Sequence, residues 1–512
     1  MHRRLIPFGA LLLILWGCSN ESADETAVVE QEQASPQQEA QPEVQQPNFL
    51  ILISDDMGVE TLQSYGIGEI TAYTPNLDRL AQGGMQFNNH WVQPTCSPTR
   101  ATLLTGRYGF RTGMLIPTYP RHDLIDVDIP PPTEGAPVEL QYSPFAYLPP
   151  GAVSPTPPGF DFSQLPTDGL PEDELTLPQV LKSLPSGYAT AAIGKWHLAD
   201  STNGWLSAPQ EAGFDYYSGL FMGVTDSHFD WLHVEQGVAS AESGYLDERV
   251  VEDSVRWIGQ QAENDKPWLL WTAFFSPHYP ITLPPSHLLR SEASLALTDS
   301  DLNPDNTRPY VMAMIEALDT LIGQLLQNIP ESERDNTYIV FLGDNGSVKW
   351  AQPAPPVDPM RAKLTLYEGG VRTPLLVAGP GVSPGQTTDA LVNSVDLFST
   401  ILDLAGTSAE QQVPGEITLD SVSYAPLLRD PDQQELRSWI YADAKSLATG
   451  QEIYAIRDDR FKLIQQPASQ ELYDLLEDPW ENNDLMQGDL SIEQREAVQR
   501  LAAYAESLRS PQ

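Results

Sequence analysis

Uninterrupted apolar runs alternate with longer amphipathic stretches along most of the chain. The runs occupy residues 49–53, 189–193, 268–275, 338–342 and 375–378. Because they lack an alternating polar face, they predict strands that are buried on both sides, as in a parallel sheet. Helical stretches separate several of these runs, at residues 74–83, 246–263 and 310–329. This order predicts an α/β fold in which helices sandwich a large, mixed but mostly parallel sheet.

Two regions interrupt this pattern. Residues 117–171 are crowded with proline and glycine and have no clear period, which predicts a long surface insertion. From residue 431 onward the predicted elements are short strands and a final helix, at residues 439–442, 453–457, 461–465 and 491–507. We therefore expect a main domain over residues 47–430 and a small C-terminal subdomain over residues 431–512, built from an antiparallel sheet plus a helix.

The N-terminus predicts export from the cell. Arg3 and Arg4 precede an apolar run at residues 5–17, which is the pattern of a signal peptide and is short for a membrane span. The sequence LWGC at residues 15–18 resembles a bacterial lipobox, in which Cys18 is lipidated and becomes the mature N-terminus. Residues 19–46 lack Lys and Arg and are rich in Gln, Glu, Ser and Pro, which predicts a disordered acidic tether.

These features predict a signal peptide over residues 1–18 and a lipoprotein anchored in a membrane through Cys18, in the periplasm or at the cell surface. The alternative is an ordinary cleaved signal with an incidental cysteine.

The overall charge limits the partners of the protein. The chain has 28 Lys and Arg residues against 70 Asp and Glu residues, a net charge of −42. This balance argues against nucleic acid and against electrostatic adhesion to anionic lipid. An anionic substrate would also be repelled at long range, so it would need a local nest of cations or metal. If Cys18 carries lipid, Cys96 has no partner for an internal disulfide, and a lone exported thiol needs a special role.

Polar side chains follow several of the predicted strands at the point where each strand ends. They are Asp55, Asp56, Lys195, His197, His278, Asp344 and Asn345. Because ligands bind outside the carboxyl ends of the strands in an open α/β sheet, we expect these side chains to meet at one edge. Three carboxylates and an amide oxygen are hard donors that suit Ca²⁺ or Mg²⁺ rather than zinc. Read singly, Asp55 would cap a helix and Asp344 would start a turn.

A cationic set accompanies the acidic one. It consists of Arg100, Lys195, His197, His278 and Lys363. From spacing alone, Lys363 reads as a solvated surface lysine, and His278, which lies between two prolines, reads as a structural histidine. Together with a divalent ion, however, these groups would form a pocket for a tetrahedral oxyanion ester.

Several short motifs in this chain resemble those of one enzyme family. CSPTR at residues 96–100, continued by LTGR at 104–107, resembles the signature of the type I sulfatases in the alkaline phosphatase superfamily. Other segments are similar to further family motifs: GKWHL at 194–198, SPH at 276–278, GDNG at 343–346, EGG at 368–370 after Lys363, and ELYD at 471–474. The resemblance covers nearly all of residues 47–512 and implies an alkaline phosphatase-like fold.

The resemblance implies a modified nucleophile and a metal beside it. In the family, a maturation enzyme oxidises the cysteine at the position of Cys96 to Cα-formylglycine. The family's metal, most often Ca²⁺ and with Mg²⁺ possible, would be held by residue 96 and by Asp55, Asp56, Asp344 and Asn345. One hydroxyl of the hydrated aldehyde would attack sulfur to form a covalent sulfo-enzyme, and the second would expel sulfate.

The resemblance also implies roles for the cations. Arg100 and Lys195 would steady the formylglycine, and Lys195 would reach the sulfate. Lys363 would contact the sulfate and, with His278, help the leaving oxygen depart, while His197 would be the base.

The residues leave the substrate open. We expect a sulfuric ester hydrolase acting on a sulfated carbohydrate or aryl sulfate. The alternatives are a formylglycine-dependent phosphonate or phosphate ester hydrolase, and a non-catalytic lipoprotein that binds sulfated glycan. Residues 117–171 and 221–234, the latter with His228, Trp231 and His233, match no family motif, and we expect them at the mouth of the pocket.

Overall fold

The computed structural model describes residues 46–118, 169–264, 266–351, 356–433, 436–446 and 449–510, and the backbone of residues 139–140. Cys18 and the predicted signal peptide, almost all of the predicted tether and most of the predicted insertion lie outside the described residues. In the part of the chain that is described, no helix is long and apolar enough to cross a membrane.

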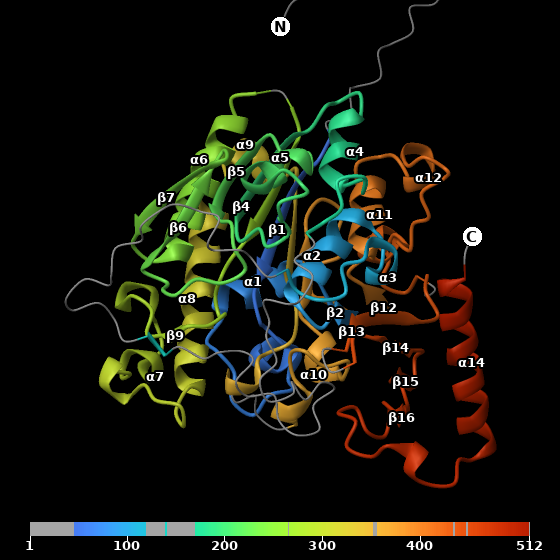
Figure 1. Ribbon diagram of the computed structural model, residues 1–512. Helices are drawn as coiled ribbons and strands as arrows, with labels where there is room; N and C mark the ends of the chain where they lie inside the picture. Colours follow the sequence, from blue (N-terminus) through green and yellow to red (C-terminus); the bar gives the residue numbers. More distant parts are fainter. Residues whose placement is uncertain are drawn as a thin grey trace, which may run out of the picture. The chain divides into compact units, whose positions relative to one another are not determined.

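A mixed, ten-stranded sheet forms the centre of the fold (Figure 1). Its strand order is β12-β2-β11-β10-β1-β8-β4-β5-β6-β7. At its middle, β1 (Asn48–Ser54) pairs in parallel with both β10 (Thr337–Gly343) and β8 (Trp268–Ala273), and β4 (Ala189–Gly194) lies parallel on the far side of β8. The remaining strands are β2 (Met85–Trp91), β5 (Tyr216–Leu220), β6 (Asp230–Glu235), β7 (Val238–Ser243), β11 (Leu375–Ala378) and β12 (Gln386–Asn393).

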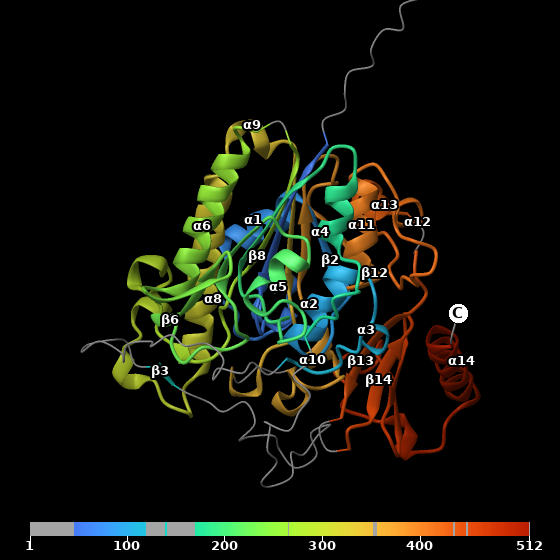
Figure 2. The same cartoon turned by 45° about the horizontal axis from the view of Figure 1, so that its top comes forward.

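Helices cover both faces of this sheet, and the alternation along β1 shows how. Phe49, Ile51 and Ile53 belong to one apolar cluster, whereas Leu50 and Leu52 belong to another. The first cluster includes residues of α2 (Cys96–Thr105), α4 (Leu177–Ser183) and α11 (Asp396–Leu404). The second includes residues of α1 (Pro75–Gly83), α6 (Leu246–Gln261) and α8 (Arg308–Gln327). Figure 2 shows the two helix layers on either side of the sheet, which confirms the predicted α/β sandwich.

A second, four-stranded antiparallel sheet follows near the C-terminus. It contains β13 (Ile440–Lys445), β14 (Glu452–Arg457), β15 (Phe461–Gln465) and β16 (Gln470–Asp474), in that order. The long helix α14 (Ile492–Arg509) packs Ala497, Leu501 and Ala505 into the same cluster as side chains of this sheet. The predicted antiparallel sheet plus helix is therefore confirmed (Figure 1).

Short elements complete the fold. They are α3 (Gly109–Thr112), α5 (Ala208–Glu211), α7 (Glu292–Leu295), α9 (Glu331–Arg334), α10 (Glu368–Val371), α12 (Ala409–Gln412) and α13 (Ala425–Arg429), with β3 (Glu139–Leu140) paired to β9 (Ile281–Thr282).

Three side chains of the segment of residues 221–234 differ from their expected place. Trp231 and His228 are fully buried, and His233 is 3% exposed. His233 Nε2 lies 2.8 Å from Ser218 Oγ, and the Trp231 ring packs edge-on against the His233 ring. These side chains therefore belong to the interior beside the sheet and do not line the mouth of a pocket.

Candidate active site

The carboxyl ends of β1 and β10 bring two acidic segments together. Ser54 is paired with Gly343 in the parallel register of these strands, so Asp55 and Asp344 follow side by side. The Asp56 backbone adopts a left-handed conformation with φ of 67°, and its N–H donates to Asp344 Oδ1 at 3.3 Å. Asn345 Nδ2 donates to Asp56 Oδ1 at 2.7 Å. All four polar side chains are buried, so the two segments form one cluster beneath the surface.

The predicted nucleophile lies beside this cluster. Cys96 is the first residue of α2; it is buried and forms no disulfide. One ligand atom from each of Asp55, Cys96 and Asp344 can be chosen so that all lie within 4.8 Å of one another. The same holds for Asp55, Asp56 and His278. Burial raises the pKa of the Cys96 thiol; the charges of Lys195 and Lys363 oppose this shift, and those of Asp55 and Asp344 add to it.

Free oxygen atoms in the cluster fit a divalent cation. Asp55 Oδ1, Asp56 Oδ2 and Asn345 Oδ1 are buried and accept no hydrogen bond within the described residues. Buried polar atoms are normally satisfied, and a set of hard oxygen donors is what Ca²⁺ and Mg²⁺ prefer. The residues predicted to hold the metal therefore present a suitable donor set at one place.

Neighbouring charges give Asp55 and Asp56 opposite pKa shifts. Burial, together with the charges of Asp55 and Asp344, raises the pKa of Asp56 to about 6, although Lys363 opposes the shift. Burial acts on Asp55 in the same direction, but Lys195, Arg100 and Lys363 outweigh it and hold the pKa of Asp55 below its ordinary value. Asp55 is thus the carboxylate that the cations stabilise most clearly in its charged form.

Arg100 and Lys195 are buried against the acidic cluster and Cys96. Arg100 Nε and Nη2 donate to Asp344 Oδ2 at 3.1 and 2.8 Å, and Nη1 donates to the carbonyl of Lys195 at 2.6 Å. Lys195 Nζ forms an ion pair with Asp55 and lies 3.9 Å from Cys96 Sγ. It also lies 5.4 Å from the centre of the Phe275 ring, which favours a cation electrostatically.

Lys363 is the most open of these cations. Its side chain is 11% exposed and its Nζ forms an ion pair with Asp56, so the sequence-based alternative of a solvated surface lysine is wrong. The Lys363 N–H donates to the Ser347 carbonyl at 2.9 Å, and the Leu364 N–H donates to the Pro94 carbonyl at 3.0 Å. The segment therefore bridges the loop after β10 and the loop before α2.

His278 approaches the cluster from the loop after β8. Its Nε2 lies 3.8 Å from Asp56 Oδ2. Its Nδ1 bonds to the Tyr279 carbonyl at 2.9 Å, which places the ring proton on Nδ1 in the neutral form. Burial and the charges of Lys195 and Lys363 hold the pKa of His278 well below its ordinary value. His228 Nε2 donates to the His278 carbonyl at 3.1 Å, so this buried histidine supports the loop from behind.

His197 is connected to α2 through a threonine that the sequence did not single out. Its Nε2 donates to the Thr118 carbonyl at 2.9 Å, which leaves Nδ1 as a buried acceptor with no hydrogen-bond partner among the described residues. Thr118 Oγ1 donates to the His197 carbonyl at 3.1 Å, and the Thr118 N–H donates to Ser97 Oγ at 3.0 Å. Burial and the charge of Lys195 hold the pKa of His197 well below its ordinary value. No hydrogen bond in the described structure joins His197 directly to Cys96.

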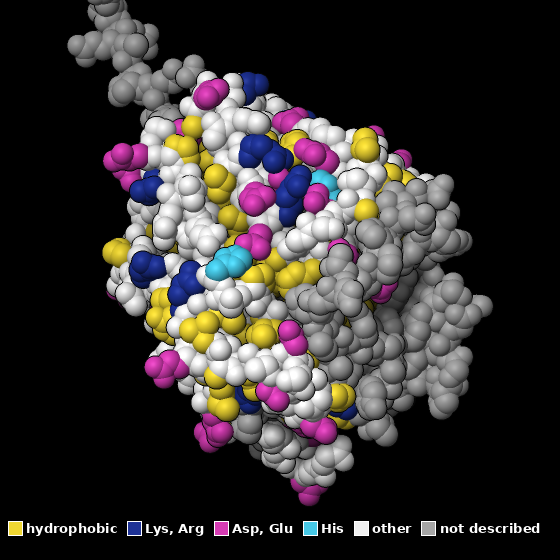
Figure 3. Space-filling view, turned by 90° about the vertical axis from the view of Figure 1, so that its left-hand side faces the viewer, with side chains coloured by type: hydrophobic (Ala, Val, Ile, Leu, Met, Phe, Trp, Pro, Cys, Tyr) yellow, Lys and Arg dark blue, Asp and Glu magenta, His cyan; other side chains and the backbone are white. Residues whose placement is uncertain are grey.

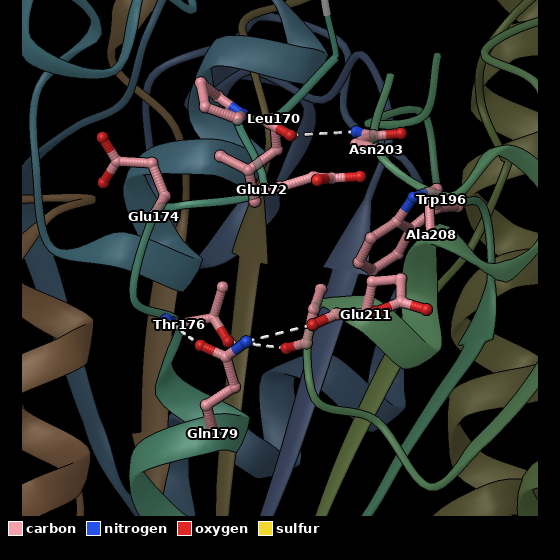
Figure 4. Close-up of a pocket in the computed structure, with 11 residues that line it drawn as sticks. Leu170, Glu172, Glu174, Thr176, Gln179, Trp196, Asn203, Ala208 and Glu211 are labelled. Atoms are coloured by element: carbon pink, nitrogen blue, oxygen red, sulfur yellow. Dashed lines mark hydrogen bonds between the residues drawn. The ribbon is translucent and has the colours of Figure 1, made fainter. Parts of the chain in front are cut away.

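Trp196, which lies between Lys195 and His197 in the sequence, faces a separate cavity (Figure 4). The cavity has a volume of about 20 Å³ and is lined by side chains that include Glu172, Gln179 and Asn203. Asn203 Nδ2 donates to the carbonyls of Leu170 and Leu198 at 2.9 and 2.8 Å, so it fixes the end of this segment. A cavity of this size holds about one water molecule, so it supports the segment and is too small for a sugar.

Comparisons with known proteins agree with this geometry. The profile of the family described as Sulfatase matches residues 47–407, and the profile described as N-sulphoglucosamine sulphohydrolase, C-terminal, matches residues 361–508. Arylsulfatase G of Rattus norvegicus is 29% identical over 469 residues, which cover 81% of this chain and 75% of the relative. An ulvan-active sulfatase of Formosa agariphila is 25% identical over 466 residues, covering 88% and 78%.

One solved structure, a crystal structure of a complex with k-i-k-neocarrahexaose, is similar with a TM-score of 0.66. It is 24% identical, and the match covers 91% of this chain and 94% of that chain.

Proposed function

The chain belongs to the sulfatase family and is an enzyme that hydrolyses sulfate esters; we propose that it acts on sulfated saccharides with a formylglycine made from Cys96. The observation that carries the proposal is the position of Cys96. This buried, unpaired cysteine begins a helix beside two carboxylates, Asp55 and Asp344, and two buried cations. A hydrated formylglycine at this position would supply one hydroxyl as the nucleophile and a second hydroxyl for release of the product.

The surrounding residues fit the proposed position of the nucleophile. Lys195 Nζ lies 3.9 Å from Cys96 Sγ. Arg100 donates to Asp344 and to the Lys195 carbonyl, so it fixes two neighbours of the residue 96 side chain, Asp344 and Lys195. His197 presents a neutral ring whose Nδ1 has a lone pair, which suits a base that takes up a proton. We assign these three residues to holding and deprotonating the nucleophile.

Lys363 and His278 each approach one carboxylate oxygen of Asp56, and both suit the leaving group. Lys363 carries the most exposed ammonium of the cluster, so it can reach the sulfuryl oxygens and the oxygen of the ester bond. His278 Nε2 lies near the same carboxylate. We propose that this pair stabilises the negative charge that develops on the departing sugar oxygen.

The acidic cluster would hold Ca²⁺, with Mg²⁺ as the second candidate. Asp55, Asp56, Asp344 and Asn345 supply buried oxygen donors, and residue 96 lies within their reach. A bound ion would offset negative charge on the sulfuryl oxygens of the substrate.

A saccharide substrate is supported by the relatives. One similar enzyme is described as ulvan-active, and one similar structure was solved in complex with k-i-k-neocarrahexaose. We further propose that the protein is an exported lipoprotein anchored through Cys18, because residues 1–46 combine a signal-like segment, a lipobox-like cysteine and an acidic tether. An anchored enzyme suits a polymer that stays outside the cell.

Mass spectrometry of the peptide that contains Cys96 tests the nucleophile. Conversion to formylglycine lowers its mass by about 18 Da, whereas oxidation of a thiol adds about 16 Da per oxygen atom. A fully unmodified thiol in active enzyme would contradict the proposal. Cys96→Ala should lower kcat/KM about a thousandfold or more, since no neighbouring group can replace the nucleophile.

Matched substrates test the reaction. The kcat/KM for 4-nitrophenyl sulfate should exceed that for 4-nitrophenyl phosphate, and the reverse order would favour the phosphate ester alternative. Sulfate release from defined sulfated oligosaccharides then identifies the natural ester.

A further inference from the structure

A second hollow lies between α1 and α8, and none of its lining residues belongs to the active site. Its volume is about 320 Å³. The lining includes Tyr73, Arg79, Arg290, Gln324 and Gln327. We propose that this hollow binds a sulfated sugar unit of the polymeric substrate, remote from the bond that is cleaved. This inference rests on the proposed function, since it assumes that the substrate is a sulfated saccharide chain.

The two arginines of the hollow carry charges without acidic partners. Among the described residues, Arg79 donates to Asn76 Oδ1 and the Pro75 carbonyl, and Arg290 Nη1 donates to the carbonyls of His287 and Leu289 at 2.5 and 2.9 Å. Neither guanidinium forms an ion pair with a carboxylate in the described structure. Both remain available for a bidentate contact with an oxyanion such as a sulfate group.

The two arginines lie together on a strongly acidic chain, which has 28 Lys and Arg residues against 70 Asp and Glu residues. On the face shown in Figure 3, Lys and Arg side chains lie among Asp and Glu side chains. Arg249 and Arg256, for example, both contact Asp253. The chain has a net charge of −42, whereas the lining of this hollow holds two arginines and one carboxylate, Asp319, so an anion there meets more positive than negative charge.

The other lining groups suit a sugar ring. Tyr73 lines the hollow and is 51% exposed, so part of this side chain is open to solvent. An aromatic face packs well against the C–H groups of a pyranose, because it combines a large apolar area with a negative quadrupole. Gln324 and Gln327 project from the exposed side of α8 and offer amide donors and acceptors for hydroxyl groups.

The floor of the hollow is already satisfied and rigid. Asp319 accepts hydrogen bonds from the backbone N–H groups of Asn76 and Leu77 at 3.0 and 2.8 Å, so it caps the start of α1. The helix end therefore needs no external anion, and the guanidinium groups are the anion-binding part. Gly323 allows the close approach of α8, because a Cβ there would lie 2.4 Å from Asn76 Oδ1. A fixed floor between two arginines favours binding without reorganisation.

The volume also matches a single sugar unit rather than a long chain. Sites for small molecules usually measure about 300–1,000 Å³, and this hollow falls at the small end of that range. Binding one unit of a polymer here would raise the effective concentration of neighbouring units at the enzyme. The hollow should therefore increase affinity for polymers and leave the hydrolysis of small esters unchanged.

Charge-matched variants test the site. The double variant Arg79→Ala/Arg290→Ala removes two positive charges at the hollow, and Arg429→Ala/Arg495→Ala removes two elsewhere on the exposed surface. In the full chain carrying Cys96→Ala, binding of dextran sulfate at about 50 mM NaCl should fall about tenfold or more for the first pair only. Tyr73→Ala should weaken binding, and Tyr73→Phe, which keeps the ring, should restore it.

With Cys96 intact, kcat/KM for 4-nitrophenyl sulfate should be unchanged in every one of these variants, which also shows that they fold. Equal losses of dextran sulfate binding in both arginine pairs would overturn the proposal, because only the overall charge would matter. The proposal would also be overturned if Tyr73→Ala bound dextran sulfate as strongly as the unchanged residue and inorganic sulfate displaced all of the arginine-dependent binding. The hollow would then be a simple anion site. Failure of the proposed function is a separate result, seen as lack of sulfate ester hydrolysis by the wild-type enzyme.

Discussion

A buried lysine in the C-terminal sheet offers the sharpest test of how the two sheets cooperate. Lys462, on β15, is fully buried, and its Nζ lies 3.0 Å from Glu368 Oε1 and 2.7 Å from Glu481 Oε1. It also lies 4.5 Å from the centre of the Trp91 ring. Glu368 begins α10, shortly after Lys363, so this lysine connects the second sheet to a segment that carries a proposed catalytic residue.

The change Lys462→Met keeps most of the volume of the side chain but removes its charge. Two carboxylates then remain buried together, with Arg457 Nη1 at 3.7 Å from Glu368 Oε2 as the nearest other cation in an ion pair there. Removing one partner of a buried ion pair typically costs about 3–5 kcal/mol of stability. By comparison, Lys182→Met breaks an exposed pair with Asp215, in which the side chains are 39% and 49% exposed, and should cost at most about 1 kcal/mol.

The cost should depend on pH, because one of the two acids can take up a proton. Burial already raises the pKa of Glu481 to about 7, although Lys462 opposes the shift. Its folded pKa lies above the ordinary value of 4.5, so its contribution to stability is present at low pH and is lost as the pH rises through about 7. Without the lysine this pKa rises further, so Lys462→Met should be more destabilising at about pH 8 than at about pH 5.5.

Thermal unfolding of wild type, Lys462→Met, Glu481→Gln and the double variant provides the measurement. Because the lysine and the glutamate share one cluster, the two changes should be non-additive by about 1–3 kcal/mol, and the double variant should be more stable than Lys462→Met. Additive effects, or equal losses at both pH values, would refute the reasoning. The kcat/KM for 4-nitrophenyl sulfate should also fall in Lys462→Met, since α10 anchors the segment of Lys363.

Metal removal, pH and one glycine substitution test other parts of the structure. Chelation should lower both Tm and kcat/KM, and Ca²⁺ or Mg²⁺ should restore them, because an ion at 100 times its Kd stabilises a fold by about 2.7 kcal/mol; an unchanged Tm would contradict the oxygen site. Burial raises the pKa of Asp443 to about 7, so stability falls as the pH rises through that value, and Asp443→Asn should flatten the decline of Tm between about pH 6 and pH 8. A Cβ at Gly223 would lie 2.0 Å from His197 Nε2, so Gly223→Ala should lower kcat/KM about tenfold or more. Gly259→Ala meets no atom within 4 Å and should not.

Much of the fold could be predicted because the central strands are buried on both sides. The run at β1 is apolar at every position from 49 to 53, and its neighbours β8 and β10 are similar. The strands that the pattern missed are less uniform. β7 is largely exposed, and β12 begins with polar, exposed residues. Their pairing depends on neighbours in the sheet rather than on their own apolar content, and a linear pattern does not record that.

The site was predictable to the extent that strand ends position it. Asp55 and Asp344 are far apart in sequence but follow two paired parallel strands, so the rule for α/β sheets brings them together. The supporting residues were not predictable in this way. Thr118 lies at the start of a stretch without periodicity, and its bonds to His197 and Ser97 arise from a loop crossing. Lys462 lies in a segment that the sequence predicts only as a short strand, and the packing in the structure shows that it is buried.

The charge balance of the site explains how so acidic a protein can accept an anionic ester. The charged groups of the cluster are three carboxylates and three cations: Asp55, Asp56, Asp344, Arg100, Lys195 and Lys363, of which only Lys363 is partly exposed. Each lysine contacts one carboxylate and Arg100 contacts two, so the cluster is close to neutral as a whole although the chain is not. A divalent ion among these oxygens would give the site a net positive charge where the surrounding field is negative. Long-range attraction therefore contributes little to substrate capture, which is why contacts close to the substrate, in the site and in the proposed hollow between α1 and α8, have to supply the affinity.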